Sequence, residues 1–432
     1  VEHHDRRFAT EFEMHTLQRL RRCLGNLHAS AHRTGDTHHC RSVVQHHRPA
    51  GVAVAADGVE HARRQELGGD LVFVRNPVQL LLQNGDRYQK SGGSPASRLL
   101  FGDALQLANG DQVKAMRRRL APPLSFERIS SAYGGLIVDE TQAFLDTWPV
   151  GTIPGLTQPL MDMLLPILVR MYFGTRGART QELGQLYLEA IALLPDGLSG
   201  FAQVGRGRRY KAAVARLDVA INALLEERLR HDQGESDFAA QFLRLGLSAR
   251  QVRDELVTMM AASYRTVGMA LVQTLRLIAE HPHIDALVAA EVANAPGHVP
   301  DPRALSYIGA VVKESLRLCP PAGLMTRTAV TADQLAGWNI PAGASVFVSP
   351  WIIQRDARFF PDPLVFRPER WLQDERALPP CAYFPFGAGA RSCIGAAMSD
   401  VMLRLVIATV TRRFRLAAPP APRAPAIANG CG

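Results

Sequence analysis

Apolar residues recur at helical spacing through much of the chain. Between residues 126 and 247 they return every three to four positions and are separated by polar breaks, which is typical of amphipathic helices. The break at Leu194-Pro195-Asp196-Gly197 predicts a loop within this region. The pattern predicts a mainly α protein. The helices expected here span about 128–147, 158–173, 179–194, 207–231 and 237–244.

A longer pattern without breaks follows. Ser248 is a good N-cap residue, and His281-Pro282 ends the run after Glu280. A helix of this length, more than thirty residues, is long for a globular protein. Another helix is predicted from Leu305 to Leu318.

Short extended segments add a small β portion. Leu71-Val72-Phe73-Val74 and Leu324-Met325-Thr326-Arg327 are expected to be strands. The stretch 338–348 predicts a hairpin turn followed by a strand. We therefore expect a single large domain that is mainly α with a small β portion.

The charge, the apolar runs and the cysteines of the chain indicate which partners and which cellular compartment to expect. The chain has 432 residues, is 47% hydrophobic and carries a formal net charge of +9. The basic residues are spread along the sequence, which favours a local docking patch for an acidic protein and predicts no nucleic-acid partner. No run of about twenty apolar residues exists to span a bilayer. The six cysteines show no C-x-x-C pairing, so we expect a reduced, soluble, cytoplasmic protein without membrane contact.

The first 66 residues differ from the rest. They hold ten of the fourteen histidines and show little sustained apolar periodicity. Runs such as His38-His39-Cys40 and His46-His47 are candidate metal ligands, although no spacing repeats a known ligand pattern. We therefore expect residues 1–66 to be an atypical His-rich N-terminal segment, divergent or disordered, that precedes the main domain at 67–432.

One glycine-rich stretch near the C-terminus carries the clearest chemistry. It contains Phe386, Gly389, Arg391, Cys393 and Gly395 in the pattern F-x-x-G-x-R-x-C-x-G. Glycines let the backbone approach a planar group closely, and an arginine can pair with an anionic edge of that group. An apolar helical pattern begins after Gly395, and a helix N-terminus favours the thiolate of Cys393 over the thiol. The stretch predicts a single thiolate that binds a cofactor.

This loop resembles the haem-thiolate signature of the cytochrome P-450 superfamily. The resemblance covers about 70–417 and includes, in the same order, an E-x-x-R pair at Glu314 and Arg317 and a P-E-R-W element at 368–371. It implies a cytochrome P-450-like haem-thiolate fold. It also implies haem b (iron protoporphyrin IX) as the cofactor, with Cys393 as the axial ligand of the haem iron.

The resemblance implies roles for three basic residues, and at two other positions the sequence departs from the family pattern. Arg117, Arg327 and Arg391 are expected to hold the haem propionates. Val113 stands where the family carries an aromatic residue that also grips a propionate, and Met402 stands where the last helix usually carries a glutamate. Members of the superfamily begin with a first helix and the opening strands of a small sheet, and the N-terminal segment does not resemble that pattern.

A buried carboxylate needs partners for its lone pairs. Glu314, Arg317 and Arg370 are therefore expected to form a closed triad that braces the cysteine loop behind the haem. The residues expected to line the substrate pocket are Leu324, Met325 and Ala262.

The centre of the long helix departs from the family most. The family pattern A-G-x-(D/E)-T aligns with Ala262-Ser263-Tyr264-Arg265-Thr266. Thr266 is expected to steer protons, but Arg265 replaces an acid and cannot release a proton at working pH. Three interpretations stay open. Thr266 and ordered water suffice for proton delivery, Arg265 binds a carboxylate or other anionic group of the substrate, or the oxygen chemistry is altered.

The resemblance implies a haem-dependent monooxygenase that oxidises a hydrophobic small molecule, in secondary metabolism. It would use O2 and electrons from NAD(P)H delivered by a ferredoxin and a ferredoxin reductase. One alternative is a hydrogen-peroxide-dependent peroxygenase, similar to the fatty-acid-oxidising members that carry arginine at the position of Arg265. Another is a haem-thiolate protein that lacks oxygenase activity.

Overall fold

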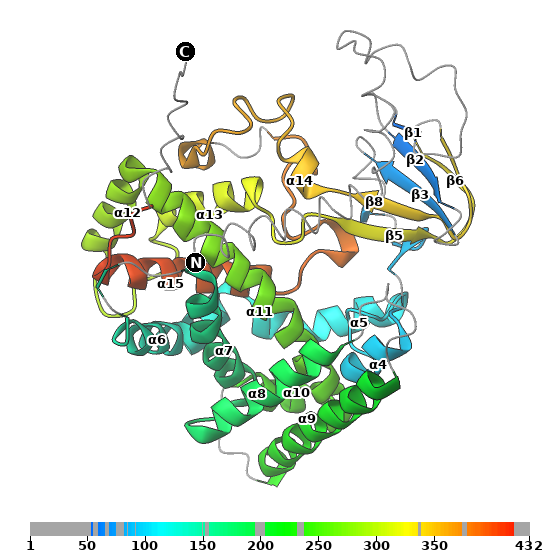
Figure 1. Ribbon diagram of the computed structural model, residues 1–432, viewed down its shortest axis with the longest axis horizontal. Coiled ribbons are helices and arrows are strands. Elements are labelled where there is room, and N and C mark those ends of the chain that lie inside the picture. The colour runs from blue at the N-terminus through cyan, green and yellow to red at the C-terminus, as the bar shows by residue number, and fades with distance from the viewer. Residues whose placement is uncertain are drawn as a thin grey trace, which may run out of the picture.

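The structure of the chain is a computed structural model in which helices dominate and a sheet lies at one side (Figure 1). This arrangement confirms the mainly α fold class with a small β portion. The structure describes residues 53–54, 59–64, 69–74, 82–83, 85–90, 92–148, 150–151, 155–194, 204–230, 237–335, 338–373 and 378–418.

The helical pattern between residues 126 and 247 is confirmed, and every helix boundary lies within three residues of its predicted position. Local capping explains some of these boundaries. The Ser125 and Asp237 side chains accept hydrogen bonds from backbone N–H groups of the first turns that follow them. The helices are α6 (Phe126–Leu145), α7 (Thr157–Phe173), α8 (Ala178–Leu193), α9 (Val204–Arg230) and α10 (Phe238–Arg244).

The predicted long helix is α11 (Ala249–Glu280), which passes through the middle of the molecule (Figure 1). A capping box starts it. The Gln251 N–H donates to Ser248 Oγ at 3.3 Å, and the Ser248 N–H donates to Gln251 Oε1 at 3.0 Å. Most of its side chains are buried, as a helix at the centre of a large domain requires.

Shorter helices complete the α portion. They are α4 (Pro95–Phe101), α5 (Asp111–Leu120), α12 (Pro282–Asn294), α13 (Ser306–Leu318), α14 (Pro350–Ile353) and α15 (Ala396–Arg413). Single turns of 3-10 helix occur at Pro122–Leu124, Pro368–Trp371 and Gly389–Arg391.

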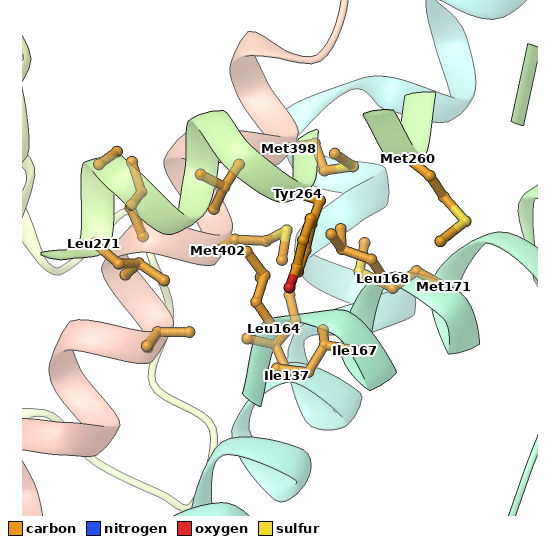
Figure 2. Close-up of a cluster of buried hydrophobic side chains, with 14 of the residues drawn as sticks. Ile137, Leu164, Ile167, Leu168, Met171, Met260, Tyr264, Leu271, Met398 and Met402 are labelled. Atoms are coloured by element: carbon orange, nitrogen blue, oxygen red, sulfur yellow. The ribbon is translucent and has the colours of Figure 1, made fainter. Parts of the chain in front are cut away.

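The main core lies between α6, α7, α11 and α15. Figure 2 shows its centre, where side chains of these helices interdigitate. Met402 on α15 is fully buried there, so an apolar residue occupies the place of the family's glutamate and leaves no buried charge. The labelled members are Ile137, Leu164, Ile167, Leu168, Met171, Met260, Tyr264, Leu271, Met398 and Met402.

The sheet combines strands from the N-terminal part of the described chain with strands from residues 325–348. Its six strands run in the order β1-β2-β3-β8-β5-β4, with β3 and β8 parallel and the other neighbours antiparallel. The strands are β1 (Ala53–Val54), β2 (Val59–Arg64), β3 (Gly69–Val74), β4 (Tyr88–Gln89), β5 (Met325–Ala329) and β8 (Ser345–Val348).

The predicted strand is confirmed as β8 (Ser345–Val348), and a turn precedes it, but the pairing that a hairpin implies is wrong. β7 (Trp338–Ile340) pairs with β6 (Asp333–Leu335) in a separate two-stranded sheet. β8 instead lies between β5 and β3, so both of its edges are already hydrogen-bonded and none remains for β7.

Two strands fall within the segment 1–66, where the sequence showed no strand pattern. β2 pairs along its whole length with β3, so the sheet crosses the proposed boundary between residues 66 and 67. The histidine runs at 38–47 lie outside the described residues. In the part of the chain that the structure describes, no helix is both long and apolar enough to cross a membrane.

Candidate functional site

The cysteine loop is a tight turn that ends at the start of α15. The Cys393 N–H donates to the Phe386 carbonyl at 2.7 Å, which closes the loop. Gly387 and Gly389 adopt φ values of 72° and 69°, in the left-handed region that favours glycine. A Cβ on Gly389 would lie 2.2 Å from the Leu82 carbonyl oxygen, so no larger residue fits there.

The Cys393 thiol lies just before the N-terminus of α15, whose N-cap is Gly395. Cys393 is a free cysteine with exposed surface. Burial by surrounding atoms nevertheless raises the pKa of its thiol, while the Gly395 N–H, Arg117 and Lys90 act in the opposite direction. A metal ion bound to the sulfur would reverse the balance, because a coordinating thiol loses its proton.

Four cationic side chains form a cluster that includes the surroundings of this thiol. Lys90 and Arg117 act on Cys393 electrostatically, and Arg327 and Arg391 act on Lys90. Desolvation lowers the pKa of each arginine, and no carboxylate within the described ranges forms an ion pair with any of the four. A thiol beside unbalanced positive charge fits a haem, which offers iron to the sulfur and two carboxylates to the cations.

The predicted propionate ligands occupy distinct positions in this cluster. Arg327 lies on β5 and is 5% exposed. Arg117 lies on α5 and donates to Ser392 Oγ at 3.4 Å, which joins α5 to the cysteine loop. Arg391 donates to the carbonyls of Leu105 and Ala108, at 3.2 and 2.6 Å, and its remaining N–H groups stay available for an anion.

One face of α11 is open although the helix is otherwise mostly buried. Ala262, Arg265 and Thr266 are exposed, whereas Ser263 and Tyr264 between them are buried. Thr266 Oγ1 donates to the Ala262 carbonyl at 2.5 Å, so its proton is used within the helix and its oxygen can still accept a hydrogen bond.

Arg265 forms no ion pair or hydrogen bond with any residue that the structure describes. Its guanidinium counteracts the rise in pKa that burial causes at Tyr187 and Tyr264, so it lies within electrostatic range of both rings. An exposed guanidinium without a protein partner is suited to bind an anion from outside the chain.

Tyr172 connects this helix to the start of α15. Its hydroxyl donates to Ser263 Oγ at 3.0 Å and lies 3.8 Å from Met398 Sδ. The charge of Cys393 contributes to the raised pKa of Tyr172, although burial is the main cause. Ser263, at the family's glycine position, is therefore buried with its hydroxyl satisfied, and α11 is tied to the helix that follows the cysteine loop.

Glu314 on α13 is the centre of a buried network. Its carboxylate accepts from Arg317 Nε and Nη2 at 2.9 and 2.8 Å and from Arg370 Nε at 3.0 Å. The Trp371 indole N–H and the Arg367 backbone N–H also donate to it, at 2.8 and 3.0 Å. The predicted triad is thus hydrogen-bonded, and the last two donors fill the remaining lone pairs of the carboxylate.

This network reaches the cysteine loop through Gln354. Arg317 donates to the Gln354 carbonyl at 2.8 Å, and Gln354 Oε1 accepts from the Phe384 N–H at 2.8 Å. Phe384 precedes the signature by two residues. The triad therefore fixes the segment that leads into the loop.

The remaining predicted site residues flank the loop. Phe386 packs against the main core, and Met325 lies against Gly387, where a Cβ would be 3.7 Å from the Met325 side chain. Leu324 is half-buried next to it. Sequence reasoning missed Lys90, which no motif marks. It also missed Glu255, Tyr172 and Gln354, whose contacts join residues far apart in the chain.

Glu255 holds the loop between α4 and α5 against α11. It is 3% exposed, and its Oε1 accepts from the Leu105 N–H at 2.8 Å. The Leu105 carbonyl accepts a hydrogen bond from Arg391. The loop between α4 and α5 therefore connects Glu255 to the cysteine loop. Burial, with a smaller effect of Asp254, raises the pKa of Glu255 to about 7 against an ordinary value of 4.5.

Replacing Glu255 with glutamine is expected to flatten the pH dependence of stability between about pH 4.5 and 7. Because its pKa is higher in the folded state, the folded protein binds more protons in this window, and stability falls as pH rises through it. The contribution is at most about 3 kcal/mol. Denaturant unfolding at several pH values measures it.

The exposed Glu226 on α9 provides the control for this experiment. Glu226→Gln should keep the parent slope. An unchanged slope in Glu255→Gln would show that the Glu255 carboxyl titrates normally in the folded protein.

The mainly α fold and a free thiol beside cations that are unpaired in the described chain are features that a haem-binding protein requires. The family model described as "Cytochrome P450" matches residues 79–430, and the chain belongs to that family. It is an oxidoreductase, a P450-type monooxygenase with a haem-iron cofactor.

Relatives with assigned activities are similar over most of their length. The chain is 29% identical to cyclooctat-9-en-7-ol 5-monooxygenase of Streptomyces melanosporofaciens, over 81% of this chain and 83% of that protein. It is also 29% identical to pentalenene oxygenase of Streptomyces avermitilis, over 70% and 72%. Among solved structures, the haem domain of cytochrome P450DA has the same fold, with a TM-score of 0.75, 24% identity and coverage of 84% and 85%.

Proposed function

We propose that this chain uses haem b and dioxygen to oxidise a cyclic terpene or terpene alcohol in secondary metabolism. The observation that carries the proposal is the exposed Cys393 thiol within a group of cations that lack carboxylate partners in the described chain. The names of the relatives support the substrate class, since they act on cyclooctat-9-en-7-ol and pentalenene skeletons.

The positions of the residues support the following roles. Cys393 binds the iron, and Arg117, Arg327 and Arg391 bind the propionates. Bound in this way, haem supplies the activation of dioxygen. Ala262 and the half-buried Leu324 and Met325 offer apolar surface to the substrate. Thr266 accepts a hydrogen bond from water through its free lone pairs and so orients the water that delivers protons.

Electrons come from NAD(P)H through a ferredoxin and its reductase. The basic side chains at the end of α5, including the exposed Arg118, support this partner, because they lie on the helix that contacts the cysteine loop through Arg117. An acidic protein that docks there would be steered by these charges.

The test is turnover by purified protein with NADPH, ferredoxin and ferredoxin reductase on a panel of cyclic terpenes and terpene alcohols. Binding is measured first as a low- to high-spin shift of the haem spectrum. The proposal predicts spin shifts and oxygenated products from some of these compounds. Normal haem binding with no product under any reductant or peroxide would instead favour a haem-thiolate protein without oxygenase activity.

A second candidate has its own support in Arg265. The exposed guanidinium has no partner within the described chain, so it can hold the carboxylate of an acidic substrate, and hydrogen peroxide would then replace dioxygen and electrons. Turnover with hydrogen peroxide alone, without ferredoxin, distinguishes this peroxygenase from the first candidate.

Arg265→Gln is expected to weaken the binding of a terpenoid acid by about tenfold to a hundredfold, because a charge-assisted hydrogen bond is lost. Binding of the matching neutral alcohol should change little. Spin-shift titrations with both ligands measure the two affinities. Arg276→Gln, on the same helix and paired with Glu280, is the matched control. Equal affinities for the acid in Arg265→Gln and the parent would exclude carboxylate binding by Arg265.

A further inference from the structure

Lys90 lies directly after β4, opposite another cation. β4 pairs with β5 antiparallel, with Tyr88 opposite Ala329 and Gln89 opposite Thr328. The next position in this register places Lys90 opposite Arg327. The Asn109 side chain donates to the Lys90 carbonyl at 2.9 Å and fixes the backbone there. Like charges directly opposite each other destabilise a strand pair, so this arrangement requires a compensating group.

No acidic side chain among the described residues provides that compensation. Arg327 is 5% exposed, and the hydrogen bond of its guanidinium goes from Nη1 to the Thr326 carbonyl, at 2.8 Å. Neither Lys90 nor Arg327 forms an ion pair within these ranges. A buried guanidinium with so few partners is costly, which indicates that an anion from outside the chain belongs beside it.

The electrostatics of Lys90 agree with this geometry. Among the protein's own groups, burial and then Arg391 and Arg327 lower the pKa of Lys90 to about 8, and only Cys393 acts to raise it. A carboxylate near the ammonium would restore its preference for the charged form.

We propose that Lys90 and Arg327 form a cross-strand clamp that holds one carboxylate of the haem, so that Lys90 is a fourth cationic residue of the cofactor site. The second haem carboxylate would be bound by Arg117, which donates to Ser392 of the cysteine loop, and by Arg391, which belongs to that loop and donates to the Leu105 carbonyl. The inference rests on haem as the cofactor.

The clamp is tested in the haem-bound protein with Lys90→Met. Loss of one charge-assisted hydrogen bond is expected to speed haem transfer to apomyoglobin by about tenfold or more. The reduction potential should also fall, because a positive charge near the haem favours the reduced iron. Lys90→Arg should restore both values. Only four lysines occur, and the exposed Lys211 on α9 provides the control Lys211→Met.

The haem transfer rate, the reduction potential and the affinity for substrate together show whether Lys90 binds a haem carboxylate, a substrate carboxylate or neither. Faster haem loss and a lower potential in Lys90→Met alone, without substrate, support the clamp. A haem transfer rate and potential equal to those of Lys211→Met would overturn it. If only the affinity for carboxylated substrates falls, Lys90 binds a substrate carboxylate and the propionate assignment is wrong. If the parent protein binds no haem at all, the proposed function fails together with the clamp.

Discussion

Glu314→Ala is expected to destabilise the protein by about 3–5 kcal/mol and to abolish stable haem retention. The Glu314 carboxylate is fully buried and accepts hydrogen bonds from Arg317, Arg370 and Trp371. Without it, the fully buried Arg317 guanidinium and the mostly buried one of Arg370 lose their counter-charge. The midpoint of denaturant unfolding, followed by fluorescence and by haem absorbance, measures both effects.

The control for this variant is Glu280→Ala on α11. Glu280 also pairs with an arginine in its own helix, but both side chains are exposed, at 38% and 41%. A surface pair of this kind is worth about 1 kcal/mol or less. Similar losses in the two variants would contradict the view that the buried network braces the cysteine loop.

Cys393→Ser is expected to lower turnover by about a hundredfold or more, since loss of even an outer-shell partner of a metal ligand costs about 10- to 100-fold. Serine keeps the size of the side chain but provides no thiolate to the iron. The loop should fold as before, because its closing hydrogen bond uses the Cys393 backbone N–H. Product formation per mole of protein and the haem-to-protein ratio are the measurements.

Cys381→Ser is the control, because Cys381 is another free cysteine and lies close to the loop in sequence. It should retain parental turnover. If Cys393→Ser kept parental turnover too, the iron ligand would have to be another residue.

The parts of the fold that follow from local patterns were predictable. Periodic apolar residues fix α6 to α11 because a helix buries one face at a fixed spacing. The cysteine signature fixes its loop because Gly389 allows a backbone approach that no side chain permits. In both cases the deciding residues are neighbours in sequence.

The contacts that join distant residues were not predictable. The E-x-x-R pair identified Glu314 and Arg317. No local sequence pattern predicted that Gln354 would link Arg317 to Phe384 by hydrogen bonds. Likewise β8 was expected to follow a hairpin, and the choice of its partners depends on β3, far away in the chain. The position of Lys90 opposite Arg327 depends on the register between β4, a strand of two residues, and β5, and no sequence pattern reveals that register.

The central claim is that Cys393 holds the haem iron as a thiolate. The most direct measurement is the absorption spectrum of the freshly purified protein after reduction and addition of carbon monoxide. We predict the red-shifted Soret band of a thiolate-ligated ferrous carbonyl haem in the parent protein, and its absence in Cys393→Ser. A parent spectrum without that band, in protein that contains a full complement of haem, would contradict the claim.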